Sequence, residues 1–173
     1  MGGLDEKARP QEKPRHKVLL STPFAMGKYQ VSQRLWSQVM GSNPSKQVMS
    51  EHPAPSCFPV ENVSWDDCIE FCNRLSRNEG LKPAYVRDGN EVQYDFDAEG
   101  YRLPTEAEWE YCARGGEYHL YAGSDDIDEV GWVLRNAQRK RMRVGQKKSN
   151  GFGLYDMSGN VLEWCWDSFG DYD

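Results

Sequence analysis

The sequence has no long hydrophobic run. Nothing in its 173 residues approaches the roughly 18 consecutive apolar residues that a membrane-spanning helix needs, so we expect no membrane partner. Residues 1–17 are charged and contain no apolar segment, so we expect no signal peptide there. Hydrophobic residues make up only 38% of the chain and the mean hydropathy is −0.81. The core must therefore be built from few side chains.

Cysteine is sparse and forms no C-x-x-C pair. The five cysteines are Cys57, Cys68, Cys72, Cys112 and Cys165. An odd number without a secretion signal favours reduced thiols and a cytoplasmic location. Cys68 and Cys72 lie one helical turn apart and could ligate a metal, but we interpret them as small buried side chains.

Features of nucleophilic catalysis and of nucleic-acid binding are also scarce. The three histidines have no zinc-type spacing, and the Ser and Cys residues lack a nearby base that would activate them. Seven basic residues fall between Arg135 and Lys148, a run that could attract an acidic partner or a phosphate backbone. The run contains no aromatic residue for base stacking, and the chain has a net charge of −6. We interpret it as a solvated loop and expect no nucleic-acid partner.

Aromatic residues, in contrast, are plentiful. They make up 12% of the chain and include six Trp, enough to supply a core because each buries a large area. The length suits one domain with a sizeable core.

Capping residues predict helices with defined ends. Ser32 can cap a helix over residues 33–40, and Gly41 can end it. Ser64 begins a second helix with Asp67 in a variant of the capping box, and Gly80 stops it. Helical spacing predicts its buried face, which consists of Cys68, Phe71, Cys72 and Leu75.

A third helix begins after Thr105, where Glu108 completes a capping box, and ends at residues 115–116. Glu106 and Glu108 could act as an acid–base pair, but we favour a structural role in accepting free N–H groups of the first turn.

Strand patterns are short. Residues 17–22 and 29–31 are predicted as strands, and residues 86–94 as a hairpin around Asp88-Gly89. Residues 1–16 are polar and rich in proline, and we expect a flexible N-terminal segment there. Residues 41–59 contain four Pro and are predicted to form a long surface loop.

The stretch over residues 150–167 combines acids with aromatic mass. Asp156 and Glu163 lie on either side of a Gly159-Asn160 turn. Such a turn can direct acids and carbonyls inward, which suits a hard cation with oxygen ligands. The alternative is a strand–turn–strand whose aromatics fill the core and whose acids face water.

Three blocks of sequence, over residues 59–65 (PVENVSW), 100–111 (GYRLPTEAEWEY) and 150–167 (NGFGLYDMSGNVLEWCWD), resemble the formylglycine-generating enzyme (sulfatase-modifying factor) domain family. They occur in the family's order. Residues 13–18 and 26–31 also resemble it. The resemblance implies a C-type-lectin-like fold of the α+β class, irregular and loop-rich, with few short helices and strands, over residues 17–173.

The resemblance also implies a structural calcium site. The family's turn binds calcium through one side-chain oxygen, two main-chain carbonyls and a glutamate, and these fall on Asp156, Gly159, Val161 and Glu163. A second calcium site of some members needs an acidic insertion that is missing between Val133 and Asn150, so we do not expect it.

Catalytic residues do not carry over from the resemblance. Formylglycine-generating enzymes bind copper(I) through two cysteines located well after the E-W-x-x-D segment, in a closing region that residues 1–173 do not contain. We therefore expect the domain to be incomplete at its C-terminal end, and copper only where that region is present. Cys165 is not a counterpart of either cysteine, and Leu162 stands where true oxidases usually have Trp.

Two functions of different class follow. The first is a non-catalytic, calcium-stabilised lectin-like scaffold that binds a protein or peptide ligand, as in the variable proteins of diversity-generating retroelements. The alternative is the N-terminal part of a copper-dependent oxidase that converts a sulfatase cysteine to formylglycine. Iron-dependent sulfoxide synthases are related, but they need a His-rich second domain that these residues lack.

Overall fold

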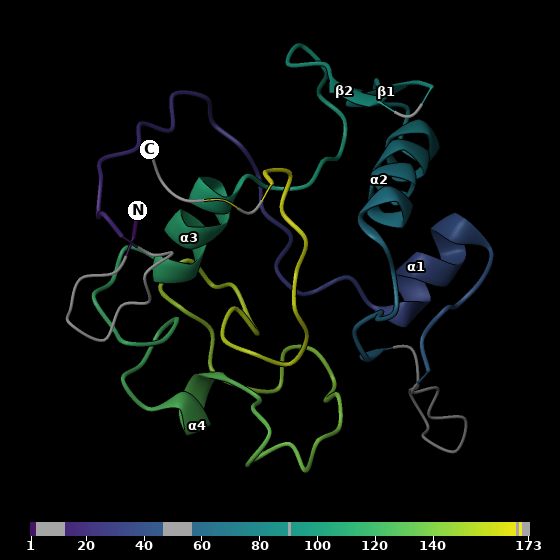
Figure 1. The fold of residues 1–173 in the computed structure, drawn as a ribbon. Coiled ribbons are helices and arrows are strands. Elements are labelled where there is room, and N and C mark those ends of the chain that lie inside the picture. The colour runs from purple at the N-terminus through teal and green to yellow at the C-terminus, as the bar shows by residue number, and fades with distance from the viewer. Residues whose placement is uncertain (3–12, 47–56, 90, 169, 171–173) are drawn as a thin grey trace.

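The computed structural model describes residues 1–2, 13–46, 57–89, 91–168 and 170. Its regular elements are short and are joined by long irregular segments (Figure 1). In chain order they are α1 (Gln33–Met40), α2 (Trp65–Asn78), β1 (Tyr85–Asp88), β2 (Glu91–Tyr94), α3 (Glu106–Arg114) and α4 (Ile127–Val130). The predicted α+β, loop-rich class is confirmed.

The predicted helix ends are confirmed at the level of individual hydrogen bonds. The Ser32 hydroxyl accepts the N–H of Leu35 at the start of α1, and Gly41 ends the helix at φ 79°. Ser64 and Thr105 each form a complete capping box, so their short helices begin with satisfied backbone donors. The acids of these boxes accept backbone N–H groups, which is the structural role expected for Glu108.

Strand prediction succeeded only where pairing is local. β1 and β2 form the predicted antiparallel hairpin, with Tyr85 opposite Tyr94. The strands predicted at residues 17–22 and 29–31 are wrong, because no described segment forms a ladder with either. Near the second, the backbone forms only an isolated bridge between Ser32 and Pro59. A strand requires a partner that supplies alternating donors and acceptors, and a single-segment pattern cannot reveal whether one exists.

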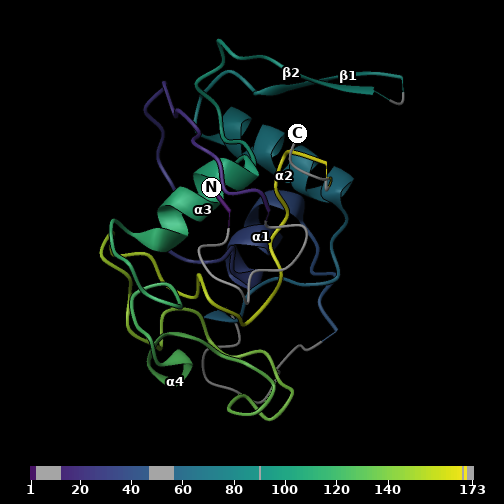
Figure 2. The same cartoon turned by 60° about the vertical axis from the view of Figure 1, so that its left-hand side comes forward.

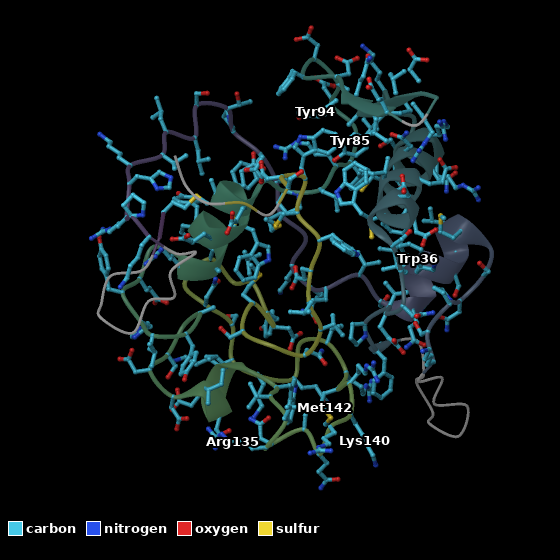
Figure 3. The ribbon with its side chains drawn as sticks, in the orientation of Figure 1. Trp36, Tyr85, Tyr94, Arg135, Lys140 and Met142 are labelled. Carbon is cyan, nitrogen blue, oxygen red and sulfur yellow. The ribbon has the colours of Figure 1, made fainter. Side chains whose placement is uncertain are left out.

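The larger of two apolar clusters lies between α1, α2 and the hairpin. The rings of Trp36 and Phe71 stack with centroids 4.9 Å apart. Cys72 is buried in this cluster and Cys68 packs against it, as expected for small core side chains. Figure 3 shows the two cluster residues Trp36, on α1, and Tyr85, at the start of β1.

A second cluster lies under α3, where Cys112, Leu154 and Met157 are buried together. The C-terminal segment, yellow in Figures 1 and 2, passes from this cluster toward α2. There Trp166 stacks on Tyr85 at 5.0 Å and donates its backbone N–H to Pro104 O at 2.8 Å. The C-terminal segment therefore connects the two clusters.

The basic run over residues 135–148 is an irregular loop, as predicted, but several of its cations are paired. Arg135 contacts Asp128 at 2.7 Å and Arg141 contacts Glu61 at 3.3 Å. These ion pairs attach the loop to acids elsewhere in the fold and reduce the charge it offers to a partner.

Within the described residues, no helix is both long and apolar enough to cross a membrane. Most of the segment predicted as flexible, and most of the loop predicted over residues 41–59, lie outside the described residues.

Replacing Thr105 by Ala should lower the free energy of unfolding by about 0.5–2 kcal/mol, because the Thr105 hydroxyl accepts the Glu108 N–H at 3.2 Å. Urea denaturation measures the change. Thr22→Ala, at an exposed position outside any helix, is the control and should change the value by less than about 0.5 kcal/mol. Equal stabilities for the two variants would contradict the capping role.

Candidate functional site

The turn that resembles a calcium site is anchored at its beginning by Asn150. This side chain is buried, and its Nδ2 donates to the carbonyl of Cys112 at 2.7 Å, near the end of α3. Its Oδ1 accepts the N–H of Leu154 at 3.1 Å. One amide thus ties the start of the segment to α3 and also shapes the chain that follows.

Further along, Gly159 and Asn160 hold the turn against two other loops. The Asn160 side chain exchanges two hydrogen bonds with the backbone of Met142, at 2.9 and 3.1 Å. Its backbone N–H donates to Trp132 O at 2.8 Å. A Cβ on Gly159 would lie 2.3 Å from that same carbonyl, and φ there is 111°, so only glycine fits. Figure 3 shows Met142 on the loop that the Asn160 side chain contacts.

Asp156 is almost completely buried, with 2% of its surface exposed. Its Oδ2 accepts the N–H of Gly145 at 2.7 Å, whereas its Oδ1 is buried and has no partner. Its φ of 59° lies in the left-handed region, which Asp tolerates better than most residues. The alternative in which the acids of the turn face water is therefore wrong for Asp156.

The oxygens of the turn converge on one atom, the Nε2 of Gln30. The main-chain carbonyls of Gly159 and Val161 each lie 3.2 Å from it, and the carbonyl of Asp156 lies 3.4 Å from it. The Oε1 of Glu163 lies closest, at 2.8 Å. All four residues predicted from the sequence thus contribute an oxygen to one small volume, although Asp156 does so through its main chain.

Glu163 is exposed as a residue, but its carboxylate lies among protein groups. Its Oε2 accepts the indole N–H of Trp109, from α3, at 3.2 Å. Burial raises the pKa of Glu163, and hydrogen bonds from Gln30 and Trp109 offset part of that effect. Burial likewise raises the pKa of Asp156, with partial compensation from the Gly145 N–H. Two carboxylates that are costly to ionise therefore lie within one turn.

These residues fit calcium. A Gln amide has two hydrogens and cannot satisfy four acceptors, so Nε2 leaves part of the oxygen set without a donor. Two further buried oxygens, Asp156 Oδ1 and Gln30 Oε1, have no partner at all. Calcium takes six to eight oxygens from carboxylates, amides and carbonyls. In the part of the chain described, no three His, Cys, Asp or Glu side chains gather, so two carboxylates would supply all of the negative charge.

Three of the five cysteines are poor candidate ligands for copper(I). Burial raises the pKa of Cys68 and of Cys72 to about 12, so both remain protonated thiols at neutral pH. Burial also raises the pKa of Cys165 to about 12, with a further contribution from Asp167. Copper(I) binds thiolates. Burial therefore makes Cys68, Cys72 and Cys165 poorer ligands for copper(I) than exposed thiols.

Gln30 is the residue of the site that sequence reasoning missed. It precedes the turn by more than 120 residues, so no local pattern connects the two. A partial indication did exist, because Gln30 falls within the block over residues 26–31 that resembles the family.

The raised pKa values predict how stability depends on pH. An acid whose pKa is higher in the folded state destabilises that state once it ionises, so stability is lost as pH rises through the folded pKa. We compare the free energy of unfolding of the wild type with that of an Asp156→Asn/Glu163→Gln double variant. When a chelator removes calcium, the difference, wild type minus variant, should increase as the pH falls from 7 to 5. In saturating calcium the relative trend should reverse, because the ionised acids bind the cation. Urea denaturation at each pH measures both, and identical trends would contradict the site.

Comparison with known proteins places this chain in a family. The model of the sulfatase-modifying factor enzyme 1-like domain matches residues 1–173. The chaperone protein LppX of Paenibacillus barcinonensis is 42% identical over 83% of this chain and 62% of its own length. The formylglycine-generating enzyme of Thermomonospora curvata is 29% identical over 96% of this chain and 67% of its own length.

A solved structure agrees with the sequence comparisons. Treponema denticola variable protein 1 superposes with a TM-score of 0.77 and is 36% identical, over 83% of this chain and 64% of that one. The chain thus spans a little under two thirds of LppX and of this neighbour. From the family match, the shared fold and the turn described above, we conclude that the chain belongs to the sulfatase-modifying factor (formylglycine-generating enzyme-like) domain family.

Proposed function

We propose that this domain is a non-catalytic, calcium-stabilised lectin-like scaffold that binds a protein or peptide partner. The observation that carries the proposal is the convergence of oxygens from Asp156, Gly159, Val161 and Glu163 on one position. A cation there would hold a turn that has little regular structure of its own. It would thereby stabilise the loop surface around it.

The surface beside this turn suits a partner. Leu162 lies between two of the proposed ligands and is fully exposed, and the neighbouring Trp164 is 49% exposed. Exposed aromatic and aliphatic side chains on a rigid support are typical anchors of protein interfaces. LppX is named a chaperone, a class of protein that binds other proteins, which supports a binding role.

The state of the cysteines supports both the absence of oxidase chemistry within these residues and a cytoplasmic location. Cys68, Cys72, Cys112 and Cys165 are free thiols, and burial raises the pKa of each. Free thiols are typical of a reducing compartment.

The alternative function is the N-terminal part of a copper-dependent oxidase. It is supported by sequence identity to formylglycine-generating enzymes. The enzyme of Streptomyces coelicolor, for example, is 36% identical over 64% of this chain.

An oxidation assay distinguishes the two functions. The chain would be incubated with copper(I), oxygen and a Cys-x-Pro-x-Arg peptide, and mass spectrometry would detect any aldehyde. We expect none, because burial disfavours the thiolate form that copper(I) binds, as the raised pKa values of Cys68 and Cys72 indicate. A formylglycine-generating enzyme is the positive control. Aldehyde formation that is lost when any one of the five cysteines is changed to Ser would overturn the non-catalytic assignment.

Partner binding can be tested at Leu162. Peptides selected from a displayed library against the wild type in calcium should bind Leu162→Asp at least about tenfold more weakly, because a charge then replaces an apolar anchor. Leu19→Asp is the matched control, since Leu19 is 81% exposed and does not belong to the turn. An equal loss of peptide affinity in both variants, or no loss of affinity in either, would contradict a binding surface at this turn.

A further inference from the structure

The amide of Gln30 is oriented so that one end has too many partners and the other has none. Its Nε2 has four oxygens within 3.4 Å, whereas its Oε1 is buried without a hydrogen-bond donor. Only 8% of the residue is exposed, so water offers little compensation. An unsatisfied buried acceptor costs free energy, which makes this orientation a poor resting arrangement.

The backbone around Gln30 is fixed from both sides. The carbonyl of Lys28 accepts the N–H of Tyr155 at 3.1 Å, and the carbonyl of Val31 accepts the N–H of Val60 at 2.8 Å. The rings of Tyr29 and Tyr155 also lie 5.1 Å apart. The side chain of Gln30 is therefore held against the turn, and its amide can change partners by rotation alone.

Rotation of the amide by half a turn exchanges its two ends. Without a cation, this rotation would bring Oε1 against four other oxygens, which repel it. With a cation, the same rotation brings a fifth neutral or anionic oxygen to the ion and removes the N–H groups that would repel it. Amide orientation and cation binding are therefore coupled, with opposite preferences in the two states.

We propose that Gln30 is a ligand of the cation through Oε1, and that its amide rotates when the ion binds. This inference rests on the proposed calcium-stabilised scaffold and adds a residue from the N-terminal half of the chain to the turn's own ligands. The ion then cross-links residue 30 to residues 156–163. In the absence of the ion, the Nε2 of Gln30 substitutes for it and keeps the oxygens apart.

Calcium titration of Gln30 variants by calorimetry tests the proposal. Gln30→Glu should bind calcium about tenfold or more tightly than the wild type, because it adds a negative ligand, and Gln30→Met about tenfold or more weakly, because it removes an oxygen. Gln33→Met is the matched control: Gln33 is also buried, but it bonds to Pro59 O and Asn43. Its calcium affinity should equal that of the wild type.

A second measurement does not depend on the folding of any variant. In the wild type, the side-chain ¹⁵N amide signal of Gln30 should shift strongly on calcium saturation, while that of Gln33 stays in place. Unchanged affinity in Gln30→Met with an unshifted Gln30 signal would overturn the ligand role but leave the calcium scaffold intact. Tighter binding by Gln30→Met would also overturn it, since the amide would then compete with the ion. Absence of calcium binding by the wild type would instead overturn the scaffold, and this inference with it.

Discussion

Several oxygens that would repel one another are held around a single position, and the loops that contact the turn over residues 156–163 maintain this arrangement. Three are main-chain carbonyls of residues that belong to no helix or strand, and one belongs to Glu163. Buried oxygens without hydrogen-bond donors are costly, so such a cluster favours a donor or a cation at its centre. In the structure the amide of Gln30 provides a partial substitute, because it has two hydrogens for four acceptors. This mismatch is the physical basis for the proposed cation.

The surrounding fold fixes the turn from every side with polar side chains rather than with sheet. Asn150 joins it to α3, Asn160 joins it to the loop at Met142, and Trp109 donates to Glu163. The apolar clusters then anchor the flanks, with Met157 under α3 and Trp166 against Tyr85. A cation at the centre would connect these parts, since Gln30 and the turn come from opposite ends of the chain. The exposed Leu162 lies on the same turn, so a partner bound there would contact a surface that the proposed ion would stabilise.

Much of the local structure was predictable because its causes are local. Ser32, Ser64 and Thr105 cap helices through contacts within four residues, and Asp88-Gly89 turns a hairpin whose strands pair with each other. The four residues of the turn were predicted by resemblance, and their arrangement around one position depends on the tertiary fold. Gln30 could not be inferred from spacing, because only tertiary structure brings it to the turn. The strands expected at residues 17–22 and 29–31 failed for a related reason, since an apolar run does not specify a partner.

The central claim is that calcium occupies the position now held by the Gln30 amide nitrogen. A crystal structure determined in saturating calcium, with anomalous scattering to identify the ion, tests it most directly. The account predicts one anomalous peak between Gln30 and the turn, with oxygens of Glu163, Gly159 and Val161 at about 2.3–2.6 Å from it. A map with no peak there, and with Nε2 of Gln30 still on the same four oxygens, would contradict it.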